Sequence, residues 1–291
     1  MLISISLILI SGLALGELCK KVKLPSLFGM IIAGILIGPS VLNLLDDSIL
    51  SISSDIRRIA LIIILIRAGL KLNVDDLKRV GRPAVMMCFV PACFEIFGMV
   101  LLAPKFLGLS VLDSAILGAV VGAVSPAVVV PRMIKLIDEK RGTDKSIPQM
   151  ILAGASVDDV FVIVMFTTFT GMAKGEKASV MSFVNIPVSI VIGILAGALA
   201  GVLLEIIFTK AKISIPVQSV IILAVSFALN FIEGAVSFIP FAALIAIMSL
   251  GVAIKKKNEN MAKSLSNVFD KLWIPAEIFL FVLVGASVAI D

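Results

Sequence analysis

Histidine and tyrosine are both absent from this sequence, and charged residues are scarce. Without histidine no imidazole can ligate a metal or act as a base, so any proton transfer would fall to carboxylates. Charged residues make up 15% of the 291 positions, whereas soluble domains carry about a quarter. Three cysteines, Cys19, Cys88 and Cys93, lie in or beside apolar segments without metal-site spacing. We therefore expect neither a metal centre nor a disulfide bridge.

Apolar residues are correspondingly abundant, at 60% of the chain. They form continuous runs near the ~20 residues that a helix needs to cross the hydrocarbon of a bilayer. Backbone polar groups in lipid must bond internally, and continuous rather than alternating runs favour helices. The sequence predicts an all-α, polytopic membrane protein with ten segments, at roughly 2–18, 25–42, 56–72, 83–103, 109–136, 147–169, 183–208, 217–233, 238–254 and 273–290.

The net charge of +5 is explained by topology. With ten spans, 19 of the 25 lysines and arginines fall in loops on one side, and five of the other six fall on the opposite side. Positive charge marks the cytoplasmic side of a membrane protein. The sequence therefore predicts a multi-pass protein of the cell membrane with its N-terminus outside, and gives no support for nucleic-acid binding.

Three pairs of positions recur at nearly one spacing. Glu17 matches Glu233, Leu24-Pro25 matches Ile239-Pro240, and Gly69 with Asp75 matches Gly285 with Asp291. Seven helices separate the copies, so the second copy would be inverted, as in many secondary transporters. We expect one transporter domain, 1–291, made of a first repeat at 1–172, a linker helix at 183–208 and an incomplete second repeat at 217–291. Completing that repeat would take a protein of roughly 390 residues.

Two adjacent carboxylates, Asp158 and Asp159, lie near the middle of the sixth segment. A charge at that depth costs several kcal/mol, which marks a functional site. A carboxylate that titrates near neutrality holds either a proton or a cation, and this competition is the minimal mechanism of an antiporter. Ser156, on the N-terminal side of the pair, is either a hydroxyl ligand or a small packing residue.

The fifth segment is interrupted by Ser125-Pro126 and again by Pro131. Proline removes a helical hydrogen bond and frees a carbonyl. Broken membrane helices occur where the backbone lines a cavity, and their free carbonyls suit cations. We expect Ser125 and Pro126 to support the site. Glu95, mid-way along the fourth segment, is a second cation ligand, a proton relay or, as we favour, half of a buried ion pair.

The runs IRRIALIIILIRAGLKL, LGAVVGAVSPAVVVPRM and RGTDKSIPQMILAGASVDDVF resemble the NHA-type branch of the monovalent cation:proton antiporters. KLPSLFGMIIAGILIGP and LFVLVGASVAID are similar to other helices of that superfamily. The resemblance covers nearly the whole chain. It implies an NhaA-like fold of about thirteen helices, of which about ten are present here.

The resemblance also implies roles. Asp159 would be the essential cation and proton site, assisted by Asp158, with sodium or lithium exchanged for protons by a mobile core in a homodimer. Glu95 would face a basic residue on a later helix, expected beyond Asp291. No cofactor, resident metal or enzymatic residue is expected.

Alternatives remain for the function. Carboxylates and carbonyls do not distinguish sodium from potassium, so a potassium/proton antiporter is the alternative most similar to the predicted function. A channel or a non-transporting scaffold belongs to a different class. An intramembrane aspartyl protease would need two aspartates from separate helices, and the adjacent pair on one helix has the wrong geometry.

Overall fold

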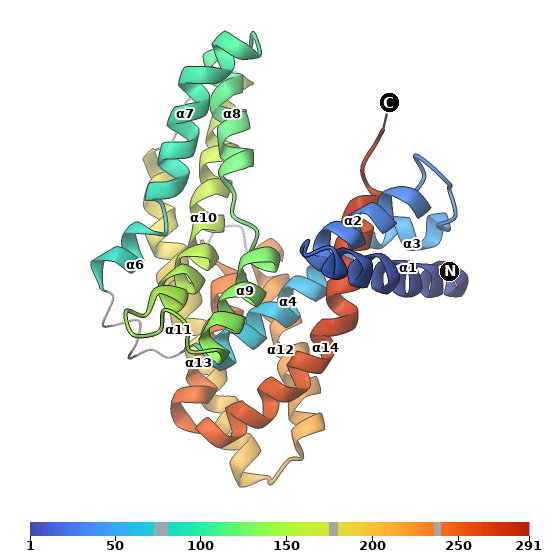
Figure 1. Cartoon of the computed structure of the whole chain (residues 1–291). Helices are drawn as coiled ribbons and strands as arrows, with labels where there is room; N and C mark the ends of the chain where they lie inside the picture. Colours follow the sequence, from blue (N-terminus) through green and yellow to red (C-terminus); the bar gives the residue numbers. More distant parts are fainter. Residues whose placement is uncertain (73–74, 76–80, 175–179, 236–239, 291) are drawn as a thin grey trace. The chain divides into compact units, whose positions relative to one another are not determined.

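The computed structural model describes residues 1–290 except 73–74, 76–80, 175–179 and 236–239, and the side chains of 156, 157, 159, 160 and 180–184 also lie outside the described part. Every regular element in the described residues is a helix (Figure 1), which confirms the all-α prediction. The helices are α1 (Leu2–Lys21), α2 (Ser26–Ile37), α3 (Asp47–Ser51), α4 (Ser53–Lys71), α6 (Arg82–Met86), α7 (Val90–Phe106), α8 (Val111–Gly122), α9 (Pro126–Asp138), α10 (Ile147–Ala173), α11 (Val180–Lys210), α12 (Ile215–Ala235), α13 (Ala243–Lys257) and α14 (Glu259–Ala286).

Five described segments are long and apolar enough to span a bilayer: Leu2–Lys21, Arg82–Leu107, Val111–Asp138, Asn185–Lys210 and Ile215–Ala235. Two shorter apolar helices are Ser26–Ile37 and Phe161–Ala173. The predicted segment 56–72 is helical but carries more charge, because α4 contains Arg57, Arg58 and Arg67. Several spans in this part of the chain establish a polytopic protein.

The helix that contains the last predicted apolar segment, 273–290, starts earlier than that segment, because α14 begins at Glu259. Asn258 caps this helix, with its side-chain oxygen accepting the Met261 N–H at 3.0 Å. Residues 259–272 include several charged side chains, so their hydropathy predicts a loop. Their apolar positions nevertheless follow a helical period, with Ala262, Leu265 and Phe269 all buried.

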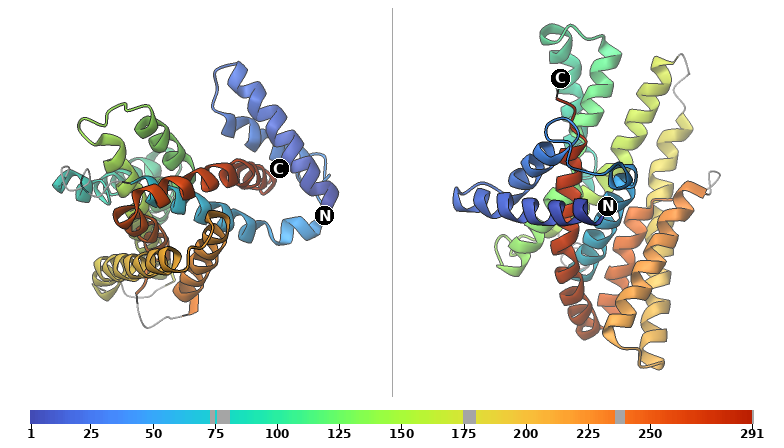
Figure 2. Two further views of the ribbon diagram at one scale, coloured as in Figure 1. Left: turned by 90° about the horizontal axis from the view of Figure 1, so that it is seen from below. Right: turned by 90° about the vertical axis from the view of Figure 1, so that its right-hand side faces the viewer.

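The chain divides into two compact units, of which unit 1 comprises residues 1–64 and 267–291. Within it, α1 and α2 form an antiparallel hairpin through a short turn (Figure 2). Glycines allow backbones to approach closely: a Cβ at Gly29 would collide with the Leu15 carbonyl, and one at Gly34 with the carbonyl of Val282 on α14. Small residues of this kind are typical of helix contacts in membranes.

Unit 2 comprises residues 65–266 and carries the candidate site. One group of helices is the α7–α8 hairpin with α10 packed against α8, while α6 and α9 also contact α10 (Figure 1). A second group is built on α13, which packs against α11 and α12. The last turn of α4 joins this second group, because Gly69 lies against the carbonyl of Met248.

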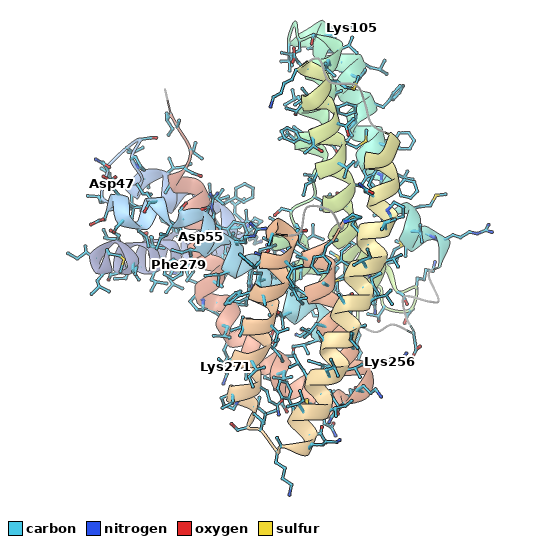
Figure 3. All side chains as sticks on the ribbon, turned by 180° about the vertical axis from the view of Figure 1, so that it is seen from behind. Asp47, Asp55, Lys105, Lys256, Lys271 and Phe279 are labelled. Carbon is cyan, nitrogen blue, oxygen red and sulfur yellow. The ribbon has the colours of Figure 1, made fainter. Side chains whose placement is uncertain are left out.

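Two lysines mark different ends of unit 2. Lys105 lies at the tip of the α7–α8 hairpin, and Lys256 lies toward the opposite end of the unit (Figure 3). The sequence places these two lysines on opposite sides of the membrane. Their separation within one unit fits an odd number of crossings between them, and the side of each stays a prediction.

One contact of unit 2 has a counterpart in unit 1. Gly69 of α4 lies against Met248 of α13, and Gly285 of α14 lies against Ile31 of α2. Gly69 and Gly285 are the positions that the sequence pairs as equivalents, and Met248 follows Ile31 at nearly the same spacing. The third helix of each predicted copy thus contacts the second helix of the other copy through a glycine.

Candidate functional site

The helix break predicted at Ser125-Pro126 is present, and it lies beside Asp158. The second interruption, predicted at Pro131, is wrong, because Pro131 lies inside the continuous helix α9. α8 ends at Gly122 and α9 begins at Pro126, with Ala123 and Ser125 in extended conformations between them. Pro126 has no N–H and cannot bond the carbonyl four residues earlier, and the extended backbone at Ala123 and Ser125 separates the two helices here. Ser125 accepts the Val128 and Val129 amides on its backbone carbonyl, both at 3.1 Å, and this starts α9. Its hydroxyl does not cap the helix.

Asp158 is held by the backbone of this break. Its side chain is 2% exposed. Oδ2 accepts a hydrogen bond from the Val124 N–H at 3.3 Å. The donor is available because Val124 belongs to neither helix, so no helical carbonyl takes its amide proton. The sequence predicts free carbonyls at the break, whereas the observed contact uses a free N–H.

The second oxygen of Asp158 has a different environment. Oδ1 is buried and has no hydrogen-bond partner in the described part of the chain. A buried carboxylate oxygen without a partner is costly, because its desolvation is not repaid by a hydrogen bond. Binding a proton or a small cation at Oδ1 would remove that cost. The arrangement anchors one oxygen and leaves the other for a ligand.

The helix termini at the break add directional fields. The C-terminal end of α8 presents carbonyls with partial negative charge, and the N-terminal end of α9 presents N–H groups with partial positive charge. Pro126 removes the helical partner of the Gly122 carbonyl. The break therefore offers a donor for the carboxylate and acceptors for a cation within one short segment.

Glu95 lies on α7, next to the break. Its Cβ and Cγ are 3.5 Å from the position of a Cβ built on Gly122, and it is an electrostatic neighbour of Asp158. The side chain is exposed and forms no ion pair with a described residue. The expected burial of Glu95 is therefore not seen, because the α7 face that carries it is not covered by a described helix. The predicted ion pair stays a prediction.

A second interruption, between α6 and α7, lies against the same helix as Asp158. Cys88 and Phe89 donate to carbonyls three residues back, at 3.1 and 3.3 Å, and so form a turn. Pro91 removes the next helical bond. The backbone of Met87 lies against Gly154 of α10, and the Phe89 ring lies 6.3 Å from that of Phe161. Sequence reasoning missed this break, although Pro91 is a visible signal for it.

Apolar packing fixes α7, α8 and α10 around the site. Ala92 and Ile96 of α7, Ala119 of α8 and Val162 of α10 form a buried cluster. Gly118 of α8 lies against the backbone of Ile96, where a side chain would clash. This packing sets the register of α10 against α8, and so carries Asp158 to the level of the break.

Two predicted site residues lie outside the description. The side chains of Asp159 and Ser156 are not described, although their backbones belong to α10. Among the predicted supporting residues, the described structure brings Pro126, buried at the start of α9, and Ser125 to the segment that contacts Asp158. In the described residues no three His, Cys, Asp or Glu side chains gather as a metal site would require.

Residues 5–291 match the family model described as sodium/hydrogen exchanger, transmembrane. The chain belongs to this family. The predicted resemblance to the cation:proton antiporter superfamily is thereby confirmed.

Curated relatives of this exchanger-family chain include sodium/hydrogen exchanger 9B2 of Homo sapiens, 38% identical over 188 residues, which cover 63% of this chain and 35% of that protein. The 9B2 protein of Xenopus tropicalis is 35% identical over 199 residues, covering 65% and 36%. Sodium/hydrogen exchanger 9B1 of Mus musculus is 37% identical over 148 residues, covering 50% and 26%. The chain thus spans about a third of these relatives, or less; their names describe transporters rather than enzymes.

A solved structure shares the fold of this exchanger-family chain. The sodium proton antiporter MjNhaP1 from Methanocaldococcus jannaschii at pH 8 superposes with a TM-score of 0.78 at 20% identity, covering 98% of this chain and 70% of that one. At this identity the match establishes the architecture. The predicted polytopic antiporter fold is confirmed.

Proposed function

We propose that this protein is a secondary active transporter that exchanges sodium or lithium for protons across the cell membrane. Asp158 and Asp159 bind the cation and the proton in competition, and the pair is exposed to the two sides alternately. The transported ions are the only ligands required, so the protein needs no cofactor and performs no enzymatic reaction.

One observation carries this proposal: a carboxylate buried in a membrane helix has one oxygen on a backbone N–H and the other without a partner. A permanently charged structural residue would have both oxygens paired. A carboxylate that must exchange ligands needs one oxygen available. The neighbouring break in α8–α9 supplies backbone acceptors, and the family of the chain makes a cation and a proton the natural ligands.

The arrangement in the membrane follows from charge. We propose that the loops at about 20–23, 71–82, 132–145, 210–212 and 255–271 face the cytoplasm and that the N-terminus lies outside. The protein is proposed to work as a homodimer. We also propose the inverted repeat, with 1–172 as the first copy and 217–291 as the start of the second, because the paired glycine contacts at Gly69 and Gly285 support it.

The proposal is tested with full-length protein in vesicles that hold an acid-inside pH gradient, followed by a pH-sensitive dye. Adding sodium or lithium outside is expected to collapse the gradient, because each entering cation releases a proton from the same carboxylates. Potassium at the same concentration is the comparison. The collapse that it causes measures the leak of the vesicles and any transport of potassium together.

Collapse with potassium alone would replace the proposal by potassium/proton exchange. Cation flux without proton movement would assign the protein to channels. If no cation changes the gradient in folded, reconstituted protein, the protein is not an antiporter under these conditions and the scaffold alternative is favoured.

A further inference from the structure

Three helix C-termini meet at the end of unit 2 that carries Lys256: those of α4, α9 and α13 (Figure 1). The last turn of each helix leaves carbonyls without helical partners and carries a partial negative charge. Such termini repel one another unless cations lie between them. Two lysines from this junction, Lys71 and Lys255, supply that charge.

Lys71, the last residue of α4, contacts both other helices. Its Nζ lies 2.9 Å from Oδ2 of Asp138, the last residue of α9, and the Lys71 side chain is only 14% exposed. Lys255, in the last turn of α13, donates from Nζ to the carbonyl oxygen of Lys71. α4, α9 and α13 are thus joined at their ends by two lysine contacts.

The two helices joined to Lys71, α13 and α9, differ in how closely they pack against α4. α4 and α13 are in backbone contact, since Gly69 lies against Met248, and Gly251 against Leu70. α9 instead packs against α10 of the other helix group. The Lys71–Asp138 ion pair therefore connects the group that carries Asp158 to the group built on α13.

The position of Asp138 at the C-terminus of α9 is unfavourable by itself. An acidic residue at a helix C-terminus is repelled by the helix dipole, by a few tenths of a kcal/mol to about 1 kcal/mol. The contact with Lys71 offsets that repulsion. Among the described residues, the neighbouring Glu139 pairs instead with Lys135 at 3.7 Å and Arg141 at 3.2 Å, both of its own segment.

We propose that the Lys71–Asp138 ion pair is a latch that holds the present conformation and must open during each transport cycle. The inference rests on the proposed exchange function, because alternating exposure requires the helices around Asp158 to move against the rest of the protein. α9 is one continuous helix from the break to Asp138, so a movement of the break moves Asp138 away from Lys71. Because the ion pair is partly exposed, it stabilises the present conformation only modestly. It thereby sets the ratio between this conformation and the one in which the pair is open.

The test compares Asp138→Asn and Lys71→Gln with Glu139→Gln in the vesicle assay. Both latch variants are expected to change the maximal rate or the half-saturating sodium concentration by about two- to fivefold in the same direction, the size given by a partly exposed ion pair. The double reversal of Lys71→Asp with Asp138→Lys is expected to return toward wild type. Glu139→Gln is expected to behave as wild type.

Unchanged kinetics in both latch variants, an equal change in Glu139→Gln, or a reversal that fails to restore them while the protein remains folded would overturn the latch. Hydrogen–deuterium exchange separates this failure from that of the proposed function, because it needs no transport. Deuterium uptake over 126–138 is expected to rise in Asp138→Asn above Glu139→Gln even in protein that moves no ions. Equal uptake in the two variants would contradict the latch by itself.

Discussion

Sodium-dependent proton movement in the Asp159→Asn variant is expected to fall to the level of protein-free vesicles. An amide neither carries the charge that attracts a cation nor releases a proton, so both halves of the exchange are lost together. Asp158→Asn should retain slow exchange, reduced by about tenfold to a hundredfold, because a hydrogen bond to a charged group contributes about 1.5–3 kcal/mol. Both rates are measured in the dye assay at saturating sodium.

The matched control for both variants is Asp113→Asn. Asp113 lies in the first turn of α8, where its carboxylate accepts a hydrogen bond from the Ser110 hydroxyl at 2.6 Å, at the other end of the helix from the break. This variant removes an equal charge from the same bundle and is expected to exchange at nearly the wild-type rate. Full activity in Asp159→Asn would remove the aspartate pair from the mechanism.

Replacing Val124 with proline is expected to slow exchange by about tenfold or more, because it removes the N–H that holds Asp158 Oδ2. The preceding residue, Ala123, already has an extended backbone with ψ of 114°, which proline favours in its neighbour. The observable is the initial rate of sodium-driven proton release, together with the half-saturating sodium concentration.

Val124→Ala separates the backbone contribution from the side chain. It keeps the N–H and removes only a partly exposed apolar side chain, so exchange within about twofold of wild type is expected. Equal losses in the alanine and proline variants would mean that the valine side chain matters and the hydrogen bond does not. Size-exclusion profiles of the two purified variants establish that both are folded.

The parts of the site that depend on single residues could be predicted from the sequence. A proline removes a helical hydrogen bond, so Ser125-Pro126 could be named as a break, whereas Pro131 lies inside α9 without interrupting it. Carboxylates in the middle of a membrane helix are costly in any fold, which singles out Asp158 and Asp159. Neither inference needs to know which helices are neighbours.

Contacts that depend on helix register could not be predicted in the same way. The hydrogen bond from Val124 requires α10 to lie at one height against α8, and this height depends on small-residue packing such as that of Ala119 in the cluster that includes Val162. Many segments of the chain contain similar small residues. The sequence therefore predicts free carbonyls at the break, but not that a free N–H reaches the carboxylate.

Averaged hydropathy also fails to identify helix ends that carry charged residues. Lys71 lies at the end of the predicted segment 56–72 and Asp138 just beyond the predicted segment 109–136, and their pairing appears only when α4 and α9 end at the same place. The start of α14 is concealed for the same reason, since its charged residues outweigh the helical spacing of Ala262, Leu265 and Phe269. Reading periodicity together with hydropathy would have placed the start of α14 earlier.

Competition between sodium and protons is the central claim, and its most direct test is the half-saturating sodium concentration between about pH 6 and about pH 8, measured on full-length protein with equal pH on both sides. If one carboxylate pair binds both ions, this concentration rises as the pH falls, approaching about tenfold per unit once the protonated form dominates, while the maximal rate at saturating sodium changes little. A half-saturating concentration that is independent of pH would contradict the account, because it would place the proton and the sodium ion on separate groups.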